Sequence, residues 1–287
     1  MPNTIKTTVS MHDQNTAPRP IHSSLGEKKF WADNLLQMIA GLPVSAVERS
    51  FKMGPQSLLS NRFLVGLSPA IWQRISWGEM ITRLGMPSAL WSVFDSEIKR
   101  ANYLGVAFEE GTHGCVFKAY LEFPVHIQTH IPESSPPALL YRGLKWNPQE
   151  QSSVAITDYL WKPRMTAEHI AKHIAPHLER LERPAVREAV QEVLRVAASR
   201  KDAREFSYLE VVENGNPRNS FDLNVYAAKY TLGELRALLG TIGAAFDIPE
   251  NQISDLLDTG ATDILGHISA GIDRAGCDFM SIYHDTP

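Results

Sequence analysis

The chain has 287 residues, 44% of them hydrophobic and 21% charged, which predicts a globular protein large enough to bury a full core. Its net charge of -4 argues against a general nucleic-acid binder, which would need a basic face. Two cysteines make no disulfide framework, and no apolar run approaches the roughly 20 residues of a membrane helix, so we expect a cytoplasmic protein without a membrane partner.

Residues 1–24 are polar and contain three prolines, which predicts a disordered segment, and we expect 25–287 to form one domain. Apolar residues at helical spacing, bounded by glycine or proline, predict the helices of this domain. They are Leu25–Ala40, a short helix at Val44–Phe51, Pro69–Arg83, Pro87–Arg100, Thr166–Leu181, Ala185–Ser199, Thr231–Phe246 and Pro249–Thr259.

Alternating apolar and polar residues predict strands, most of them joined in pairs by short turns. They are Asn61–Ser68, Tyr103–Glu109, Cys115–Phe123, Leu139–Trp146, Ser153–Trp161, Glu205–Glu213, Phe221–Ala228, Ile264–Arg274 and Phe279–Tyr283. Tightly joined strands are antiparallel, and closing the sheet removes its exposed edges. The sequence therefore predicts an α+β fold, a closed antiparallel β-barrel of about ten strands surrounded by a ring of α-helices. The alternative is an open α+β sheet with a solvated polar face.

Four of the predicted strands carry a polar residue, a spacer and a tyrosine on one side. The four are Lys118-Ala-Tyr120, Thr157-Asp-Tyr159, Asn224-Val-Tyr226 and Ser281-Ile-Tyr283. The repetition indicates a common architectural unit. In a closed barrel these polar and aromatic side chains would line the lumen.

Repeated helix–strand–strand–helix units with such tyrosine strands resemble the ABBA (PT-barrel) aromatic prenyltransferases, and most closely the cyanobactin-type peptide prenyltransferases. The resemblance runs from about Val44 to Asp285. Its most specific part is SAVERSFKMGPQSLLSNRFLVGL, in which a Glu precedes an Arg-Phe strand. It implies a prenyltransferase that moves an allylic group from dimethylallyl or geranyl diphosphate to a peptide side chain or an aromatic small molecule. It further implies Mg²⁺ bound with the diphosphate, and we expect a monomer.

The resemblance also implies roles for single residues. Glu48 resembles the acidic residue that takes the acceptor's proton. Arg62 and Lys118 resemble diphosphate ligands, and Asn224 stands at a position where relatives also carry a neutral amide. The tyrosines that resemble the shield of the allyl cation are Tyr120, Tyr159, Tyr226 and Tyr283.

The chain departs from the family at Thr157, where relatives often have a second cation. Arg142 or Lys145 on the neighbouring strand, Arg218 at a turn, or Mg²⁺ could replace it. His267 would face the lumen with Ser269 and is a further candidate for diphosphate binding. The bulk of the lumen wall, which sets donor length, is expected from Trp146, Trp161 and Phe279.

The chemistry suits these residue types, because fixed cations stabilise a leaving diphosphate and aromatic faces stabilise an allyl cation. Each residue also has a structural alternative. Lys118 could pair with Glu122, Arg62 could cap a sheet edge, Glu48 could lie on the surface, and His267 could be a satisfied wall residue. The whole barrel could instead bind a peptide or hydrophobic ligand without catalysis.

A row of histidines, His169, His173 and His177, lies at helical spacing that can bind a metal. Pro176 is expected to interrupt that helix, and no Cys or acid joins the row at zinc-motif spacing. We therefore expect a solvated helix face there and no metal held by protein side chains.

Overall fold

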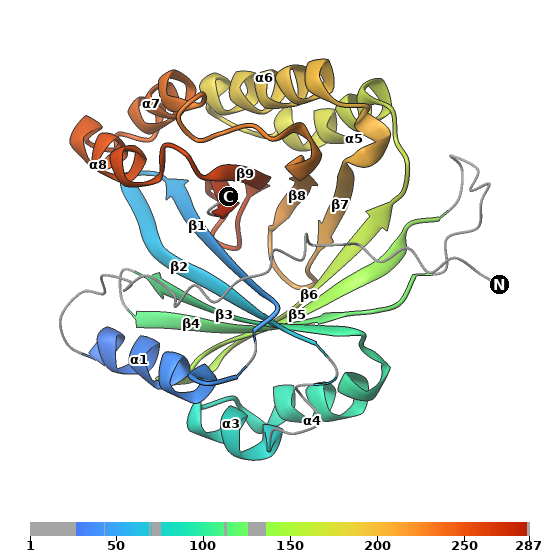
Figure 1. The fold of residues 1–287 in the computed structure, drawn as a ribbon, viewed down its shortest axis with the longest axis vertical. Helices are drawn as coiled ribbons and strands as arrows, with labels where there is room; N and C mark the ends of the chain where they lie inside the picture. The colour runs from blue at the N-terminus through green and yellow to red at the C-terminus, as the bar shows by residue number, and fades with distance from the viewer. Residues whose placement is uncertain are drawn as a thin grey trace. The chain divides into compact units, whose positions relative to one another are not determined.

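A computed structural model describes residues 27–42, 44–68, 70, 76–111, 114–125 and 136–285 (Figure 1). The predicted disordered segment 1–24 and part of the predicted helix Pro69–Arg83 lie outside these residues. No helix in the described part of the chain is long and apolar enough to span a membrane.

The described strands form one closed antiparallel sheet. They are β1 (Ala46–Gly54), β2 (Ser57–Leu67), β3 (Tyr103–Gly111), β4 (Gly114–Glu122), β5 (Ala138–Asn147), β6 (Glu150–Lys162), β7 (Ser207–Val212), β8 (Asn219–Asn224), β9 (Ile264–Ile272) and β10 (Asp278–Asp285). Their order is β1-β10-β9-β8-β7-β6-β5-β4-β3-β2, closing on β1, so the sheet has no free edge. The predicted ten-strand barrel is confirmed, and the open sheet is excluded.

Seven described α-helices accompany the strands, with three short 3₁₀ segments. The helices are α1 (Glu27–Ile39), α3 (Trp77–Arg83), α4 (Ser88–Glu97), α5 (Ala167–Leu178), α6 (Pro184–Arg200), α7 (Arg236–Ala245) and α8 (Glu250–Gly260). The 3₁₀ segments are η1 (Ile98–Arg100), η2 (Ala203–Glu205) and η3 (Tyr226–Ala228).

The chain divides into two compact units, and the division falls within β1, β2 and β6. In the first unit, α1, α3 and α4 pack on β2–β5 (Figure 1). Its core joins Leu35 of α1 and Phe94 of α4 to strand residues such as Phe63, Phe117 and Leu144. Alternate residues of the same strands point the other way, and we call the face turned away from the helices the inner face.

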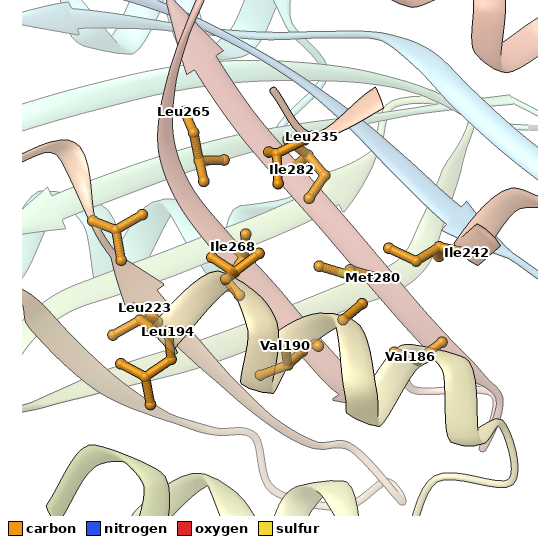
Figure 2. Close-up of a cluster of buried hydrophobic side chains, with 14 of the residues drawn as sticks. Val186, Val190, Leu194, Leu223, Leu235, Ile242, Leu265, Ile268, Met280 and Ile282 are labelled. Carbon is orange, nitrogen blue, oxygen red and sulfur yellow. The ribbon is translucent and has the colours of Figure 1, made fainter. Parts of the chain in front are cut away.

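In the second unit, α5–α8 pack on β7–β10 and the second half of β1. Figure 2 shows Val190 and Leu194 of α6 against Ile268 of β9 and Met280 of β10. The register places Leu223 of β8 opposite Ile268 of β9, and Ile268 opposite Ile282 of β10. These three apolar side chains therefore lie side by side in the helix-facing core. The residues between them along the strands belong to the inner face of this unit.

Several predicted elements differ from the structure, including Val44–Phe51, β8 and α5. Val44–Phe51 is not a helix, because most of it belongs to β1, which pairs with β10 through Ser50 opposite Tyr283. Strand β8 ends at Asn224 instead of Ala228, since Val225 leaves the extended conformation and η3 follows. Helix α5 continues through Pro176 to Leu178, because the proline stands in its last turn.

Ile268→Ala should lower the free energy of unfolding by about 2–5 kcal/mol, because the side chain is fully buried and its removal leaves a cavity in the core. Ile156→Ala is the matched control, since Ile156 on β6 is 40% exposed and should lose less than about 0.5 kcal/mol. Denaturant unfolding followed by tryptophan fluorescence measures both. Equal losses would contradict the assignment of the core.

Candidate functional site

Arg62 and Lys118 meet on the inner face of the first unit. The register places Arg62 of β2 opposite Glu109 of β3, and Lys118 of β4 opposite Ala107, two residues before Glu109. Arg62 Nε donates to Glu109 Oε2 at 2.9 Å, and Lys118 Nζ donates to the same oxygen at 2.6 Å. One carboxylate oxygen therefore holds both cations in place.

Lys145 adds a third cation to this cluster. It lies on β5 directly opposite Lys118, and its residue is 6% exposed. Like charges opposite one another across strands are destabilising unless an anion compensates them. Arg62, Lys118 and Lys145 thus bring three cations to the inner face beside Glu109, and a group of neighbouring cations attracts polyanions.

This geometry bears on the structural alternatives for two residues. Lys118 pairs with Glu109. Arg62 caps no sheet edge, because the sheet has none and the side chain is 5% exposed beside Glu109.

Tyr120 and Tyr103 continue the same inner face. Tyr120 lies opposite Gly105 on one side and Gly143 on the other. The Tyr103 ring occupies the space over Gly66, where a Cβ atom would stand 1.5 Å from the phenol oxygen. Any larger residue at position 66 would clash with the Tyr103 ring, so the position of this ring depends on Gly66.

Glu48 belongs to the surroundings of Tyr103. It is partly buried on β1, with Ser50 and Lys52 following on the same side of the strand. Burial raises the pKa of the Tyr103 phenol, and the charges of Glu122 and Glu48 add to the increase. The structure therefore places Glu48 on strand β1 near the Tyr103 phenol, and not on a helix.

Two predicted site residues face the wrong way. Arg142 lies opposite Leu121 on the helix-facing side, where its guanidinium donates to Asp158 of β6 and to Glu97 of α4. The bond to Asp158 is the main cause that raises the Arg142 pKa. The predicted role of Arg142 in diphosphate binding is wrong, since both its partners lie on the helix-facing side.

Trp146 also lies on the helix-facing side. It is opposite Phe117 in the first core, and its indole Nε1 donates to the carbonyl of Leu84 at 2.8 Å. The prediction that Trp146 lines the lumen is therefore wrong. Trp161 of β6 is 9% exposed, and its burial does not come from either helix-facing core.

The tyrosine strands keep the predicted side in most cases. Asp158 points to the helix-facing side, so alternation places Thr157 and Tyr159 on the inner face of β6. Tyr283 lies on the inner face of β10, with Phe279 and Ser281 before it. Tyr226 does not lie on a strand but in η3, where its ring stands over Gly266 at a position that a Cβ atom would fill.

His267 lies on the inner face of the second unit and interacts with residues of both neighbouring strands. It lies opposite Asn224 of β8 and Tyr283 of β10. Its ring stacks on Tyr283 with centroids 3.9 Å apart and planes 7° apart. Its Nδ1 lies 2.8 and 2.9 Å from the two oxygens of Asp222, whose side chain is 7% exposed. A carboxylate accepts only, so Nδ1 carries the hydrogen.

Two cations lie over the ring of Phe279, and the alternation of its strand does not predict either contact. Lys52 Nζ lies 4.9 Å from the ring centroid and donates to Asp273 at 3.0 Å. The Arg218 guanidinium lies 5.7 Å from the same centroid and donates to Ser220. The Phe279 ring therefore contacts two cations in the second unit. Lys52 was missed because it was placed in the break after the predicted helix Val44–Phe51, whereas it lies on strand β1.

The carboxylates on the inner faces do not form a metal site. Within the described residues, no group of three or more His, Cys, Asp or Glu side chains could hold a metal ion. Glu109, Asp273 and Asp222 instead bind the cationic or imidazole groups named above. Mg²⁺ carried by a diphosphate stays a prediction, and these side chains do not fit as its ligands.

The histidine row on α5 is not a simple solvated face. His177 is 9% exposed, and its Nδ1 lies 2.8 Å from Asn219 Oδ1 on β8. Burial lowers the His177 pKa, and the ring of His173 contacts Tyr208 of β7. The solvated-face prediction is wrong for His177, which packs against the sheet.

Solved structures share this fold. The 5-dimethylallyl tryptophan synthase of Streptomyces coelicolor, solved with DMASPP and Trp, superposes with a TM-score of 0.59 at 16% identity over 90% of this chain and 88% of that one. PriB with product diphosphate gives 0.58 at 14% identity over 89% of each chain. NotF prenyltransferase gives 0.53 at 15% identity over 84% and 81%.

The fold is that of the ABBA-type prenyltransferases. No family model and no curated protein matches the sequence. The resemblance inferred from the tyrosine strands is confirmed at the level of fold. The narrower likeness to cyanobactin-type peptide prenyltransferases stays a prediction.

Glu109→Gln should tighten the binding of inorganic diphosphate by about tenfold. The substitution keeps the size of the side chain and removes the negative charge that competes for Arg62 and Lys118, a Coulomb effect of a few kcal/mol at an effective dielectric of about 20. Glu110→Gln is the control, because Glu110 points to the other side of β3 and bonds Asn61. Isothermal titration calorimetry measures both, and weaker binding by Glu109→Gln would contradict the expectation.

Proposed function

We propose that this chain transfers a prenyl group from a prenyl diphosphate to an aromatic acceptor. The observation that carries the proposal is the cluster of Arg62, Lys118 and Lys145 on the inner face of a prenyltransferase-type barrel. Support comes from the neighbours, since one was solved with DMASPP and Trp and another with product diphosphate. Dimethylallyl and geranyl diphosphate are the donors to test, with tryptophan and aromatic peptides as acceptors.

The cation cluster suits the leaving group of this reaction. Ionisation of an allylic diphosphate puts negative charge on the diphosphate oxygens, and buried cations fixed in advance stabilise that charge without reorganisation. Arg62 offers planar donors and Lys118 and Lys145 offer point charges. The ion pairs with Glu109 hold the side chains of Arg62 and Lys118 in place before the donor binds. A diphosphate carries more negative charge than one carboxylate, so it can displace Glu109 as the partner of the two cations.

The tyrosines suit the other product of ionisation. An allyl cation is attracted to aromatic faces by about 0.5–2 kcal/mol per ring. Tyr120 lies between Gly105 and Gly143 on the same face as Lys118. Tyr159 and Tyr283 of the second unit are proposed for the same role on the resemblance alone.

Glu48 is proposed to bind the acceptor. Its neighbourhood contains the Tyr103 phenol, whose raised pKa keeps it protonated and able to donate. A carboxylate that accepts a hydrogen bond from an indole N–H or a phenol O–H increases the electron density of the ring that attacks the allyl carbon. The assignment makes Glu48 a group that contacts substrate.

A non-catalytic barrel that binds a peptide or hydrophobic ligand is the second candidate. The observation that favours it is Glu109, which neutralises part of the charge that a diphosphate would need. Turnover separates the two candidates, because a binder would hold its ligand without releasing diphosphate.

Incubating the chain with dimethylallyl or geranyl diphosphate, L-tryptophan and aromatic peptides should give a product heavier by one prenyl group in mass spectrometry. Parallel reactions with Mg²⁺ and with EDTA measure whether the metal is needed. Calorimetry with a non-hydrolysable donor analogue is run beside them. Analogue binding together with product would support the enzyme, whereas neither analogue binding nor product would contradict the enzyme and favour the barrel that binds another ligand.

Lys118→Ala should weaken donor binding by at least tenfold, because it removes one of the charge-assisted contacts to the diphosphate. Lys172→Ala on the exposed face of α5 is the matched control and should bind donor as the unchanged chain does. Calorimetry with the donor analogue gives both affinities. Equal affinities in the two variants would exclude Lys118 as a diphosphate ligand.

A further inference from the structure

Hydrogen bonds fix Arg218 at the turn between β7 and β8 in the second unit. Its backbone N–H donates to Asn216 Oδ1 at 3.0 Å, and Asn216 Nδ2 donates to Glu213 Oε1 at 2.8 Å. The guanidinium Nε of Arg218 donates to the hydroxyl of Ser220 at 3.1 Å, and Ser220 is fully buried on the inner face of β8. Both the backbone and the Nε atom of this arginine are therefore held in place.

The guanidinium of Arg218 lies near an aromatic ring on the same side of the sheet. Gly271 of β9 lies opposite both Ser220 of β8 and Phe279 of β10. It has no side chain, and a Cβ atom there would stand 2.2 Å from the carbonyl oxygen of Asn219. Strand β9 thus places no side chain between Arg218 and Phe279, and the guanidinium carbon lies 5.7 Å from the ring centroid. The ring takes part of the guanidinium out of water, where hydrogen bonds to it are stronger.

The carboxylates of the neighbouring turns and strands pair with other cations. These pairs are Glu213 with Arg274, Asp273 with Lys52, and Asp278 with Arg183. Among the described residues, no carboxylate forms an ion pair with Arg218, and its Nη1 and Nη2 atoms make no hydrogen bond. Arg218 is partly buried, and a partly buried charge without a partner is unfavourable. An anion bound at Nη1 and Nη2 would remove this cost.

The two Nη atoms suit a carboxylate. They lie side by side in one plane, and the two oxygens of a carboxylate accept from both at once. Arg218 brings one positive charge, whereas Lys52 over the same ring is already paired with Asp273 at 3.0 Å. A ligand group with one negative charge balances Arg218. A diphosphate would bring several charges close to the Asp273 carboxylate, which repels them.

We propose that Arg218 is the anchor of a carboxylate-binding site on the inner face of the second unit. The ligand is a small organic acid or a peptide C-terminus, and its carboxylate accepts from Nη1 and Nη2 while Ser220 holds Nε. Arg218 is partly exposed, so a ligand can reach it from solvent. All residues of the site belong to the second unit, and the site does not rest on the proposed prenyl transfer.

The test titrates the full chain with N-acetyl-glycyl-phenylalanine, with its C-terminal amide, with benzoate and with inorganic diphosphate. Nitrogen–proton NMR follows the Nε–H resonance of Arg218, which is assigned by its absence from Arg218→Lys. The peptide acid should shift this resonance until it saturates, and the amide should not, because it lacks the negative charge. Benzoate that binds as tightly as the peptide acid would identify a small organic acid as the ligand. Weaker binding of benzoate would identify a peptide C-terminus.

Three variants measure the part played by Arg218, with the backbone amide of Ser220 as the reporter of binding. Arg218→Gln should weaken binding of the peptide acid by about tenfold or more, because it removes the charge and the paired donors. Arg218→Lys keeps the charge but loses the planar pair of donors, so its affinity should lie between the two. Arg204→Gln is the matched control, since the Arg204 side chain is 63% exposed in the same unit, and it should bind as the unchanged chain does.

Three results would overturn the site. The first is an equal shift by the peptide acid and its amide, or no shift by either acid. The second is an unchanged affinity in Arg218→Gln at an unchanged melting temperature. If Arg218→Gln does not fold, an unchanged affinity in Arg218→Lys has the same meaning, because the paired donors would then have no role. The third is tighter binding of inorganic diphosphate than of either acid, which would make Arg218 a polyanion ligand.

Discussion

Closure of the sheet constrains every polar side chain on its inner face. The helices cover the opposite face, and strand alternation sends one residue in two inward. Within the first unit, Glu109 forms ion pairs with both Arg62 and Lys118. Within the second unit, Asp273 pairs with Lys52, and Asp222 pairs with His267. These pairs hold the charges of each inner face in fixed positions before any ligand arrives.

Such fixed pairs have a cost and a use. Burying a charge is unfavourable unless its partner is well placed, and removing one partner leaves the other uncompensated. The same low-dielectric surroundings make each remaining charge act strongly on a substrate.

The sequence was sufficient for much of the fold, because periodicity of two is a local property. The strand around Lys118 and Tyr120, the side taken by Arg62, and the side shared by Phe279 and Tyr283 all follow from alternation alone. Closure followed from the number of tight hairpins. The strand β1 was missed because eight residues with mixed apolar spacing fit a helix as well as a strand, and its pairing with β10 decides the matter.

The site was less accessible to the sequence than the fold. Arg142 and Trp146 were placed inward although Leu144 lies between them on the same side of β5, and that apolar neighbour was the available signal for a helix-facing position. The partners of Lys118 and His267 depend on register between strands. The predicted hairpin that turns at Gly111–Gly114 has a register that could have identified Glu109 as a neighbour of Lys118. Asp222 was predicted on the same side of its strand as Asn224, but the local sequence does not show that its partner is His267.

The pairing of β1 with β10 also bears on how the chain is made. Lys52 and Asp273, which bond across this part of the second unit, are 221 residues apart in sequence. During synthesis, β1 emerges from the ribosome long before the strand that covers its edge, and contacts of such separation form slowly. Until β10 has been translated, the edge of β1 that pairs with it has unpaired backbone N–H and C=O groups, which can pair with other chains. A protein of this design should depend on chaperones more heavily than its final stability suggests.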